Sequence, residues 1–218
     1  MKSGPPSRRA CLAAALLPAV ALAPGAFAAG MPKVLAFGDS LSAGLGLPPD
    51  AAFPARLEAQ LRMQGVAARV VNAGVSGDTT AGGVARLDWA LTDKPDIVLL
   101  ELGANDALRG IDPAVVRANL DRLIGLIQRS GAKLILLGMR APANWGEDYR
   151  QAFDRIYPDL AQAHGIPLYP FFLEGVAMQP QLNQPDGLHP NERGVAVIVE
   201  RVAPYVARLI GQLPGGAS

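Results

Sequence analysis

Short apolar runs alternate with longer amphipathic stretches along most of this 218-residue chain, and this alternation limits its fold more than any other feature. The runs expected to be strands span residues 33–37, 69–72, 96–102, 133–137 and, more weakly, 166–169. The stretches expected to be helices span residues 53–64, 80–91, 113–130, 147–163 and 191–213. Nearly continuous apolar strands are typical of parallel sheets that are buried on both faces. The pattern therefore predicts one three-layer α/β/α domain around a mainly parallel sheet.

The first 28 residues have the composition of a secretory signal peptide. Basic residues at positions 2, 8 and 9 precede an apolar run over residues 10–22, and Ala-Phe-Ala at residues 26–28 fits a cleavage site. The apolar run is too short to span a bilayer, which disfavours the alternative of a membrane anchor. We therefore predict a signal peptide at residues 1–28, an exported domain at residues 29–218, and a periplasmic or secreted location. The sequence does not distinguish general from twin-arginine export.

Charge and cysteine content narrow the function classes. Cleavage after Ala28 would remove three positive charges and no acidic residue, which lowers the formal charge from +1 to −2. A mildly acidic domain offers no electrostatic reason to bind nucleic acid. The one cysteine, Cys11, would leave with the signal peptide, so neither a disulfide nor thiol chemistry is expected. No metal-binding, phosphate-loop or dinucleotide motif is present, so we expect no cofactor. A monomer is expected, because no exposed heptad pattern stands out.

The residues with chemical potential follow the predicted strands. Ligands of open parallel sheets bind beyond the carboxyl ends of the strands. Ser40 follows the first predicted strand, Gly77 follows the second, Asn105 follows the third, and residues 140–146 follow the fourth. Each of these segments is therefore expected at the same rim of the sheet.

A serine, an aspartate and a histidine in this set have the types required for nucleophilic acyl transfer. A serine becomes a useful nucleophile when an imidazole takes its proton and a carboxylate orients that imidazole. The chain holds two histidines, and His189 lies three residues after Asp186, whereas His164 ends a predicted helix and is interpreted as structural. Taken alone, Ser40 is better interpreted as a helix N-cap or turn serine, and His189 as a residue of a helix start. The presence of Asp186 beside His189 favours the catalytic interpretation.

Acyl transfer also requires hydrogen-bond donors for the oxyanion of the tetrahedral intermediate. The candidate donors are the backbone N–H groups of Ser40 and Gly77 and the side-chain amide of Asn105. The alternatives are that the glycine and the asparagine are ordinary turn residues. Asp39 is expected to stabilise a turn, while Asp78 and Asp106 are each expected to cap the helix that follows them.

Four sequence blocks together resemble those of the SGNH (GDSL-type) hydrolases. The blocks are Gly-Asp-Ser-Leu-Ser-Ala-Gly at 38–44, Ser-Gly-Asp-Thr-Thr at 76–80, Gly-Ala-Asn-Asp at 103–106 and Asp-Gly-Leu-His-Pro at 186–190. The match is nearest to the branch of small periplasmic esterases with arylesterase, lysophospholipase and acyl-CoA thioesterase activities, in which the third block is often Gly-Gly-Asn-Asp. Here Ala104 replaces the second glycine, a small change that is expected to stiffen the turn beside Asn105.

The resemblance implies a flavodoxin-like five-stranded sheet with Ser40 as nucleophile, His189 as base and Asp186 as its orienting acid. It also implies an oxyanion hole made by Ser40, Gly77 and Asn105, and a mobile loop at residues 140–146 that lines the acyl site. In that loop we single out Pro142 and Trp145 as substrate-binding candidates.

We therefore predict a serine esterase that acts on small-molecule acyl esters or thioesters. A carbohydrate O-acetyl deacetylase is the main alternative, because the same site can remove an acetyl group. A protease is less favoured, because amides are poorer acyl donors. A non-catalytic extracytoplasmic lipid-binding protein is the alternative from another class, and it would resist a serine-reactive phosphonate.

Overall fold

The computed structural model describes residue 1, residue 4 and residues 30–214. Apart from Met1 and Gly4, the predicted signal peptide and its cleavage site lie outside the described residues, so the division at residue 28 stays a prediction. Within the part of the chain that is described, no helix has the length and apolar character needed to cross a membrane.

A parallel sheet of five strands forms the centre of the domain. The strands are β1 (Lys33–Gly38), β2 (Arg69–Gly74), β3 (Ile97–Glu101), β4 (Lys133–Leu137) and β5 (Leu168–Tyr169), in the order β2-β1-β3-β4-β5. Every neighbouring pair is parallel. This is the flavodoxin-like order, whose switch point lies between β1 and β3. The predicted fold class and architecture are confirmed.

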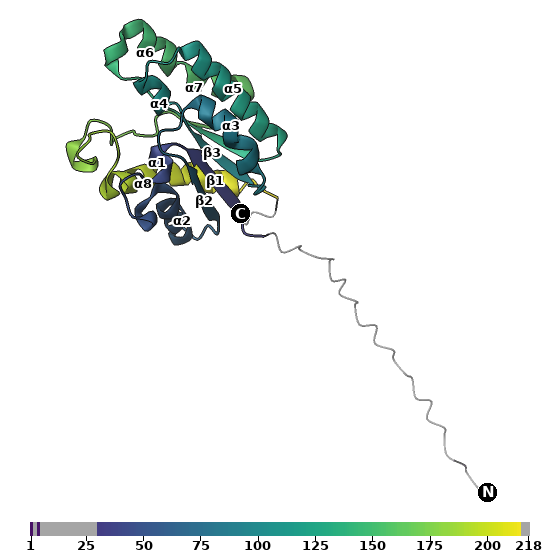
Figure 1. Ribbon diagram of the computed structural model, residues 1–218. Helices are drawn as coiled ribbons and strands as arrows, with labels where there is room; N and C mark the ends of the chain where they lie inside the picture. The colour runs from purple at the N-terminus through teal and green to yellow at the C-terminus, as the bar shows by residue number, and fades with distance from the viewer. Residues whose placement is uncertain (2–3, 5–29, 215–218) are drawn as a thin grey trace.

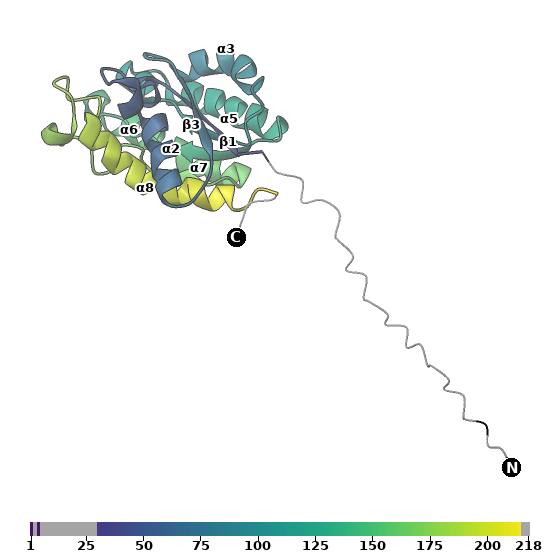
Figure 2. The same ribbon diagram turned by 90° about the horizontal axis from the view of Figure 1, so that it is seen from below.

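Helices cover both faces of the sheet, as Figures 1 and 2 show. One face carries α2 (Phe53–Met63) and α8 (Glu192–Ile210), which pack on each other. The opposite face carries α3 (Thr80–Leu91), α5 (Pro113–Arg129) and α7 (Ile156–His164). The shorter elements are α1 (Ser40–Ala43), α4 (Ala104–Leu108), α6 (Glu147–Asp154) and the 3₁₀ turns η1 (Pro49–Ala51), η2 (Ala143–Trp145) and η3 (Pro180–Leu182). The helix-on-both-faces arrangement buries β3 completely, as its continuous apolar sequence predicts.

The predicted helix over residues 147–163 is wrong, because α6 and α7 are separate helices. Pro158 lies two residues after the start of α7. Proline has no N–H group to donate to the carbonyl four residues earlier, and its ring would clash with that carbonyl. An unbroken helix through Asp154 is therefore disfavoured, and the chain restarts at Ile156.

Two helix caps also differ from expectation. Thr79, not Asp78, caps α3 by accepting the backbone N–H of Gly82. The carboxylate of Asp106 accepts the backbone N–H and the hydroxyl of Thr80, so it stabilises the start of α3 and not that of α5. Asp112 caps α5 instead. Asp78 and Asp106 therefore bind residues that the fold brings close to them, and not the first turn of the helix that follows each in the chain.

His164 makes structural contacts, as predicted. Its Nε2 atom lies 2.6 Å from Oδ1 of Asp121, and its Nδ1 atom lies 3.3 Å from Oε1 of Gln128. Both partners belong to α5, so His164 at the end of α7 links two helices of the same layer.

Candidate active site

Ser40, His189 and Asp186 form one continuous hydrogen-bonded chain. Oγ of Ser40 lies 2.9 Å from Nε2 of His189, and Nδ1 of His189 lies 2.7 Å from Oδ2 of Asp186. Ser40 is the first residue of α1, separated by one residue from the carboxyl end of β1, and is 7% exposed. The three groups have the order and spacing through which an imidazole takes a hydroxyl proton.

The Asp186 carboxylate is held as an anion by its own loop. Its Oδ1 accepts the backbone N–H groups of Leu188 and His189 at 2.9 and 3.0 Å, and its Oδ2 faces the imidazole. The hydrogen bond from the His189 backbone, then that from the imidazole, then that from Leu188 lower the pKa of Asp186 from 3.8 to about 2. The carboxylate is therefore ionised across the whole physiological range.

Gln184 secures the histidine loop to α1, and the sequence analysis did not single it out. Its backbone N–H donates to the carbonyl of His189 at 2.8 Å. Its side-chain Nε2 donates to the carbonyls of Leu45 and Pro190 at 2.7 and 3.0 Å. Because Leu45 follows α1, this amide ties the segment that carries His189 to the segment that carries Ser40. The sequence signal is weak, since a glutamine in a polar loop has no distinctive pattern.

The turn into α1 depends on Asp39 and on Gly38. The Asp39 carboxylate is the N-cap of α1, where its Oδ1 accepts the N–H of Leu41 at 2.9 Å, so the expected turn-stabilising role is present. A Cβ atom at Gly38 would lie 2.3 Å from Oε2 of Glu101 and 2.6 Å from its backbone oxygen. Only glycine allows β1 to approach β3 this closely at the point where the chain turns toward Ser40.

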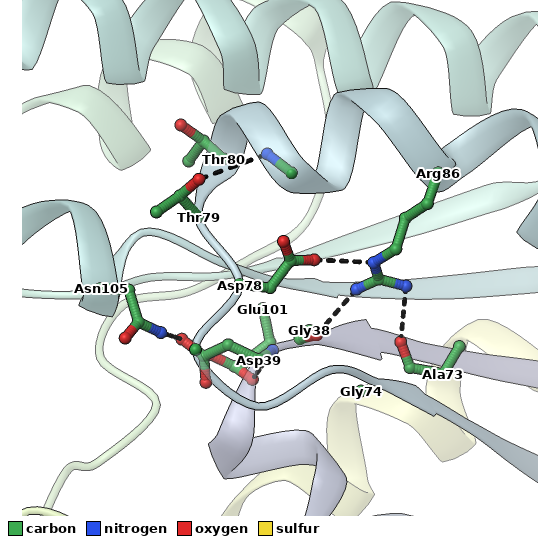
Figure 3. Close-up of polar contacts among 12 residues, drawn as sticks. Gly38, Asp39, Ala73, Gly74, Asp78, Thr79, Thr80, Arg86, Glu101 and Asn105 are labelled. Carbon is green, nitrogen blue, oxygen red and sulfur yellow. Dashed lines mark hydrogen bonds and ion pairs between the residues drawn. The ribbon is translucent and has the colours of Figure 1, made fainter.

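The three candidate oxyanion donors follow β1, β2 and β3, respectively. Within residues 30–214, the N–H groups of Ser40 and Gly77 donate to no other protein group, which leaves them available for a ligand. Gly77 adopts a φ of 81°, a conformation that favours glycine, and Arg109 donates to its carbonyl at 2.9 Å. The side-chain Nδ2 of Asn105 donates to Oδ2 of Asp39 at 3.0 Å (Figure 3).

Arg86 of α3 contacts the ends of β1 and β2 and the turn that contains Gly77 (Figure 3). Its guanidinium pairs with Asp78 at 2.7 Å and donates to the carbonyls of Gly38 and Ala73 at 2.9 and 2.8 Å. It also stacks 3.9 Å from the centre of the Phe37 ring. The arginine thus binds the ends of β1 and β2 to the turn that contains Gly77. Sequence reasoning missed it because a helical arginine is most often solvent-exposed.

Trp145 lies against the helix that carries Asn105. Its Nε1 donates to the carbonyl of Ala107 at 2.8 Å, and its ring lies near Gly110 and Tyr149. Pro142 precedes η2, the 3₁₀ turn that contains Trp145, and is half-buried. Trp145 therefore lies beside α4, which follows β3, and Pro142 belongs to the segment that follows β4. Contact of either residue with substrate stays a prediction. Among the residues described, no group of three or more potential metal ligands occurs.

Comparison with known proteins assigns the family. A model of the GDSL-like Lipase/Acylhydrolase family matches residues 36–197. The chain belongs to this family. The chain is 45% identical over 172 residues to the arylesterase of Vibrio mimicus, covering 78% of this chain and 86% of that protein. It is 40% identical over 184 residues to the thioesterase 1/protease 1/lysophospholipase L1 of Escherichia coli K12, covering 84% and 87% of the two chains.

A solved structure agrees with this assignment. AlinE4, described as an SGNH-hydrolase family esterase, is 47% identical and superposes with a TM-score of 0.71 over 84% of this chain and 98% of its own. The GDSL-like family match contains Ser40, Gly77, Asn105, Asp186 and His189 within its bounds. The resemblance inferred from four short blocks is therefore confirmed at the level of family and fold.

Proposed function

We propose that this chain is a carboxylic ester hydrolase in which Ser40 is the nucleophile, His189 the general base and Asp186 the residue that orients the imidazole. The observation that carries the proposal is the 2.9 Å contact between Oγ of Ser40 and Nε2 of His189, with the Asp186 carboxylate behind the imidazole. An ionised Asp186 favours the tautomer with hydrogen on Nδ1, which leaves the Nε2 lone pair facing the serine.

The reaction then proceeds in two acyl transfers. Oγ of Ser40 attacks the ester carbonyl carbon while Nε2 of His189 takes the hydroxyl proton, and the carbonyl oxygen becomes an oxyanion. The N–H groups of Ser40 and Gly77 and the Asn105 amide stabilise that oxyanion. The alcohol or thiol leaves with the proton from His189, which gives a Ser40 acyl ester. A water molecule, activated by His189, then hydrolyses this ester and releases the acid.

The substrate class is proposed as acyl and aryl esters, including lysophospholipids and thioesters. The similar proteins are named for arylesterase, thioesterase and lysophospholipase activities. Large apolar side chains are also exposed on segments that carry or adjoin the proposed site residues. Leu45 follows α1, Leu188 precedes His189, and Trp145 lies against α4, at 46%, 51% and 46% exposure. The aliphatic side chains of Leu45 and Leu188 offer no hydrogen bonds to sugar hydroxyls, so they suit an acyl or aryl group better than a sugar.

The first experiment is hydrolysis of p-nitrophenyl esters of two to sixteen carbons by the wild type, Ser40→Ala and Ser76→Ala. Ser76 is an exposed serine on the same rim and is the matched control. We expect Ser40→Ala to lose nearly all turnover and labelling by a fluorophosphonate, while Ser76→Ala retains both. A folded Ser40→Ala variant with normal turnover would overturn the mechanism. A restriction to acetyl esters, with preference for acetylated sugars, would favour the deacetylase.

Trp145 provides a second test of the acyl site. The chain contains two tryptophans, and the other, Trp89 in α3, is 78% exposed. In a Trp89→Phe variant, labelling Ser40 with an alkylphosphonate of eight carbons should shift the Trp145 emission, whereas a methylphosphonate should shift it less. Equal spectra for both labels would place the acyl chain away from Trp145.

We propose further that the domain is exported as a monomer after loss of residues 1–28. The basic, apolar and Ala-Phe-Ala segments of the leader support export. N-terminal sequencing of protein recovered from the periplasm tests the cleavage site, and light scattering tests the monomer. A retained leader or a stable dimer would contradict the respective part.

A further inference from the structure

Asp39 is a buried carboxylate that contacts the Asn105 side chain. It is 0% exposed, and its two oxygens have different partners: Oδ1 accepts the Leu41 N–H, and Oδ2 accepts Nδ2 of Asn105 at 3.0 Å. Figure 3 shows the Asp39 carboxylate facing the Asn105 amide across the gap between the turns after β1 and β3. One oxygen therefore serves the helix that begins with Ser40, and the other serves a proposed oxyanion donor.

A primary amide carries two N–H donors on one side and a carbonyl acceptor on the other. When one N–H of Asn105 is bound to Asp39, the second N–H on the same nitrogen remains available to a ligand. If the amide rotated by half a turn, its oxygen would face the carboxylate, which is repulsive. We propose that Asp39 is a positioning residue that fixes the Asn105 amide with its nitrogen, and not its oxygen, presented to the oxyanion. This inference rests on the proposed function.

Glu101, at the end of β3, binds the backbone of Asp39 and the side chain of Ser42 and so helps to hold the turn that carries Asp39. It is completely buried, and its Oε2 accepts the Asp39 N–H at 3.2 Å and the Ser42 hydroxyl at 2.8 Å. Within residues 30–214, its Oε1 is the one buried side-chain polar atom that lacks a partner. Burial first, and then the charge of Asp39, raise the pKa of Glu101 well above its ordinary value. Glu101 therefore holds its proton to higher pH than an ordinary glutamate, and the neighbouring Asp39 carboxylate contributes to this.

The charge on Asp39 is compatible with catalysis near neutral pH. Burial raises its pKa from 3.8 to about 6, while the hydrogen bonds from Leu41 and Asn105 and the positive charge of a protonated His189 lower it. Asp39 is therefore mostly ionised at pH 8.

The substitution Asp39→Asn tests the proposal, because it keeps shape, burial and helix cap while it removes the obligatory acceptor. The new amide can place its oxygen toward the Leu41 N–H, as an N-cap asparagine does, and its nitrogen then faces Asn105. Two donors cannot bind each other, so Asn105 is expected to turn its oxygen toward residue 39. The oxyanion would then meet a second lone pair of that oxygen in place of a donor.

A double-mutant cycle separates this effect from ordinary destabilisation. We expect Asp39→Asn to lower kcat roughly 10²–10³-fold with little change in KM, the same range as Asn105→Ala, because each removes one oxyanion donor. In the Asn105→Ala background, Asp39→Asn should change kcat by less than about threefold, because the group through which it acts is gone. Asp106→Asn is the control for a buried carboxylate on α4 that contacts Thr80 instead. It should lower the unfolding midpoint without a selective loss of kcat.

Independent, multiplicative losses of kcat from Asp39→Asn and Asn105→Ala would overturn the inference, as would normal kcat in folded Asp39→Asn. If Ser40→Ala retains turnover, the proposed function itself fails, so the two failures are distinguishable. The wild type gives a measurement that does not depend on variant folding. In its ¹⁵N spectrum, one Nδ2 proton of Asn105 should exchange with solvent more slowly than the other. Equal, fast exchange of both protons would also overturn the inference.

Discussion

Oγ of Ser40 and Nε2 of His189 lie 2.9 Å apart, although 149 residues separate the two in the chain. Ser40 begins a short helix that is separated by one residue from the end of strand β1, and His189 lies in the loop before the last helix, α8. The contact therefore depends on how α8 and its preceding loop lie over the carboxyl end of the sheet. Gln184 bonds to the backbone on both sides of this contact.

Asp186→Asn should lower kcat by about 10³–10⁴-fold while the fold is retained. The new amide oxygen can still accept the backbone N–H groups of Leu188 and His189, but its nitrogen would donate toward Nδ1 and favour the wrong imidazole tautomer. Ester hydrolysis by the variant measures the loss, with Asp88→Asn, an exposed carboxylate of α3, as the control. A loss below about tenfold would remove Asp186 from the proposed triad.

Activity should rise with pH between about 5 and 8, because a protonated imidazole cannot accept the Ser40 proton. Asp186 does not contribute to this rise, since its pKa is lowered to about 2. Asp39 contributes in the same direction, because burial raises its pKa to about 6 and its ionised form binds Asn105. Measuring kcat/KM for an uncharged ester across this range tests the prediction, and a flat profile would contradict His189 as base.

Arg86→Ala should lower the free energy of unfolding by about 2–4 kcal/mol. The substitution removes the cation that pairs with the Asp78 carboxylate, whose side chain is 10% exposed. It also removes the hydrogen-bond donor to the carbonyls of Gly38 and Ala73. Urea unfolding measures the change. Arg117→Ala is the control, because it removes an exposed pair with Asp159 and should cost less than about 1 kcal/mol. Equal losses in both variants would show that the Arg86 contacts contribute little.

The free energy of unfolding of Glu101→Gln, relative to that of the wild type, should increase as pH rises. A carboxyl group whose pKa is raised on folding stabilises the fold below its unfolded pKa, near 4.5, and loses that contribution as pH rises through the folded value. Glutamine resembles the neutral acid at every pH and can still accept from Asp39 and Ser42. Chemical unfolding from pH 5 to 9 should therefore show a growing advantage for the variant. A constant difference would indicate that Glu101 is equally protonated in the folded and unfolded states over this range, so that folding does not raise its pKa.

The strand and helix pattern predicted the sheet and its layers well, because burial on both faces leaves nearly continuous apolar runs such as Ile97–Glu101. The pattern predicted the bounds of elements less well where an element is short or contains a proline. β5 is confined to Leu168–Tyr169, since Ile166 bonds back to the end of α7 and Pro167 has no N–H to donate. Pro158 likewise divides the region that periodicity predicted as one helix.

The sequence by itself determined the fold class, the family and the candidate residues, because residue type and order carry those properties. It did not determine the partners of the buried polar groups. Asp78 pairs with Arg86, Asp106 bonds to Thr80, and Asp39 bonds to Asn105, each across turns that meet only in the folded chain. Hydrogen bonds and raised pKa values depend on distance and on exclusion of water, so only the tertiary structure decided them.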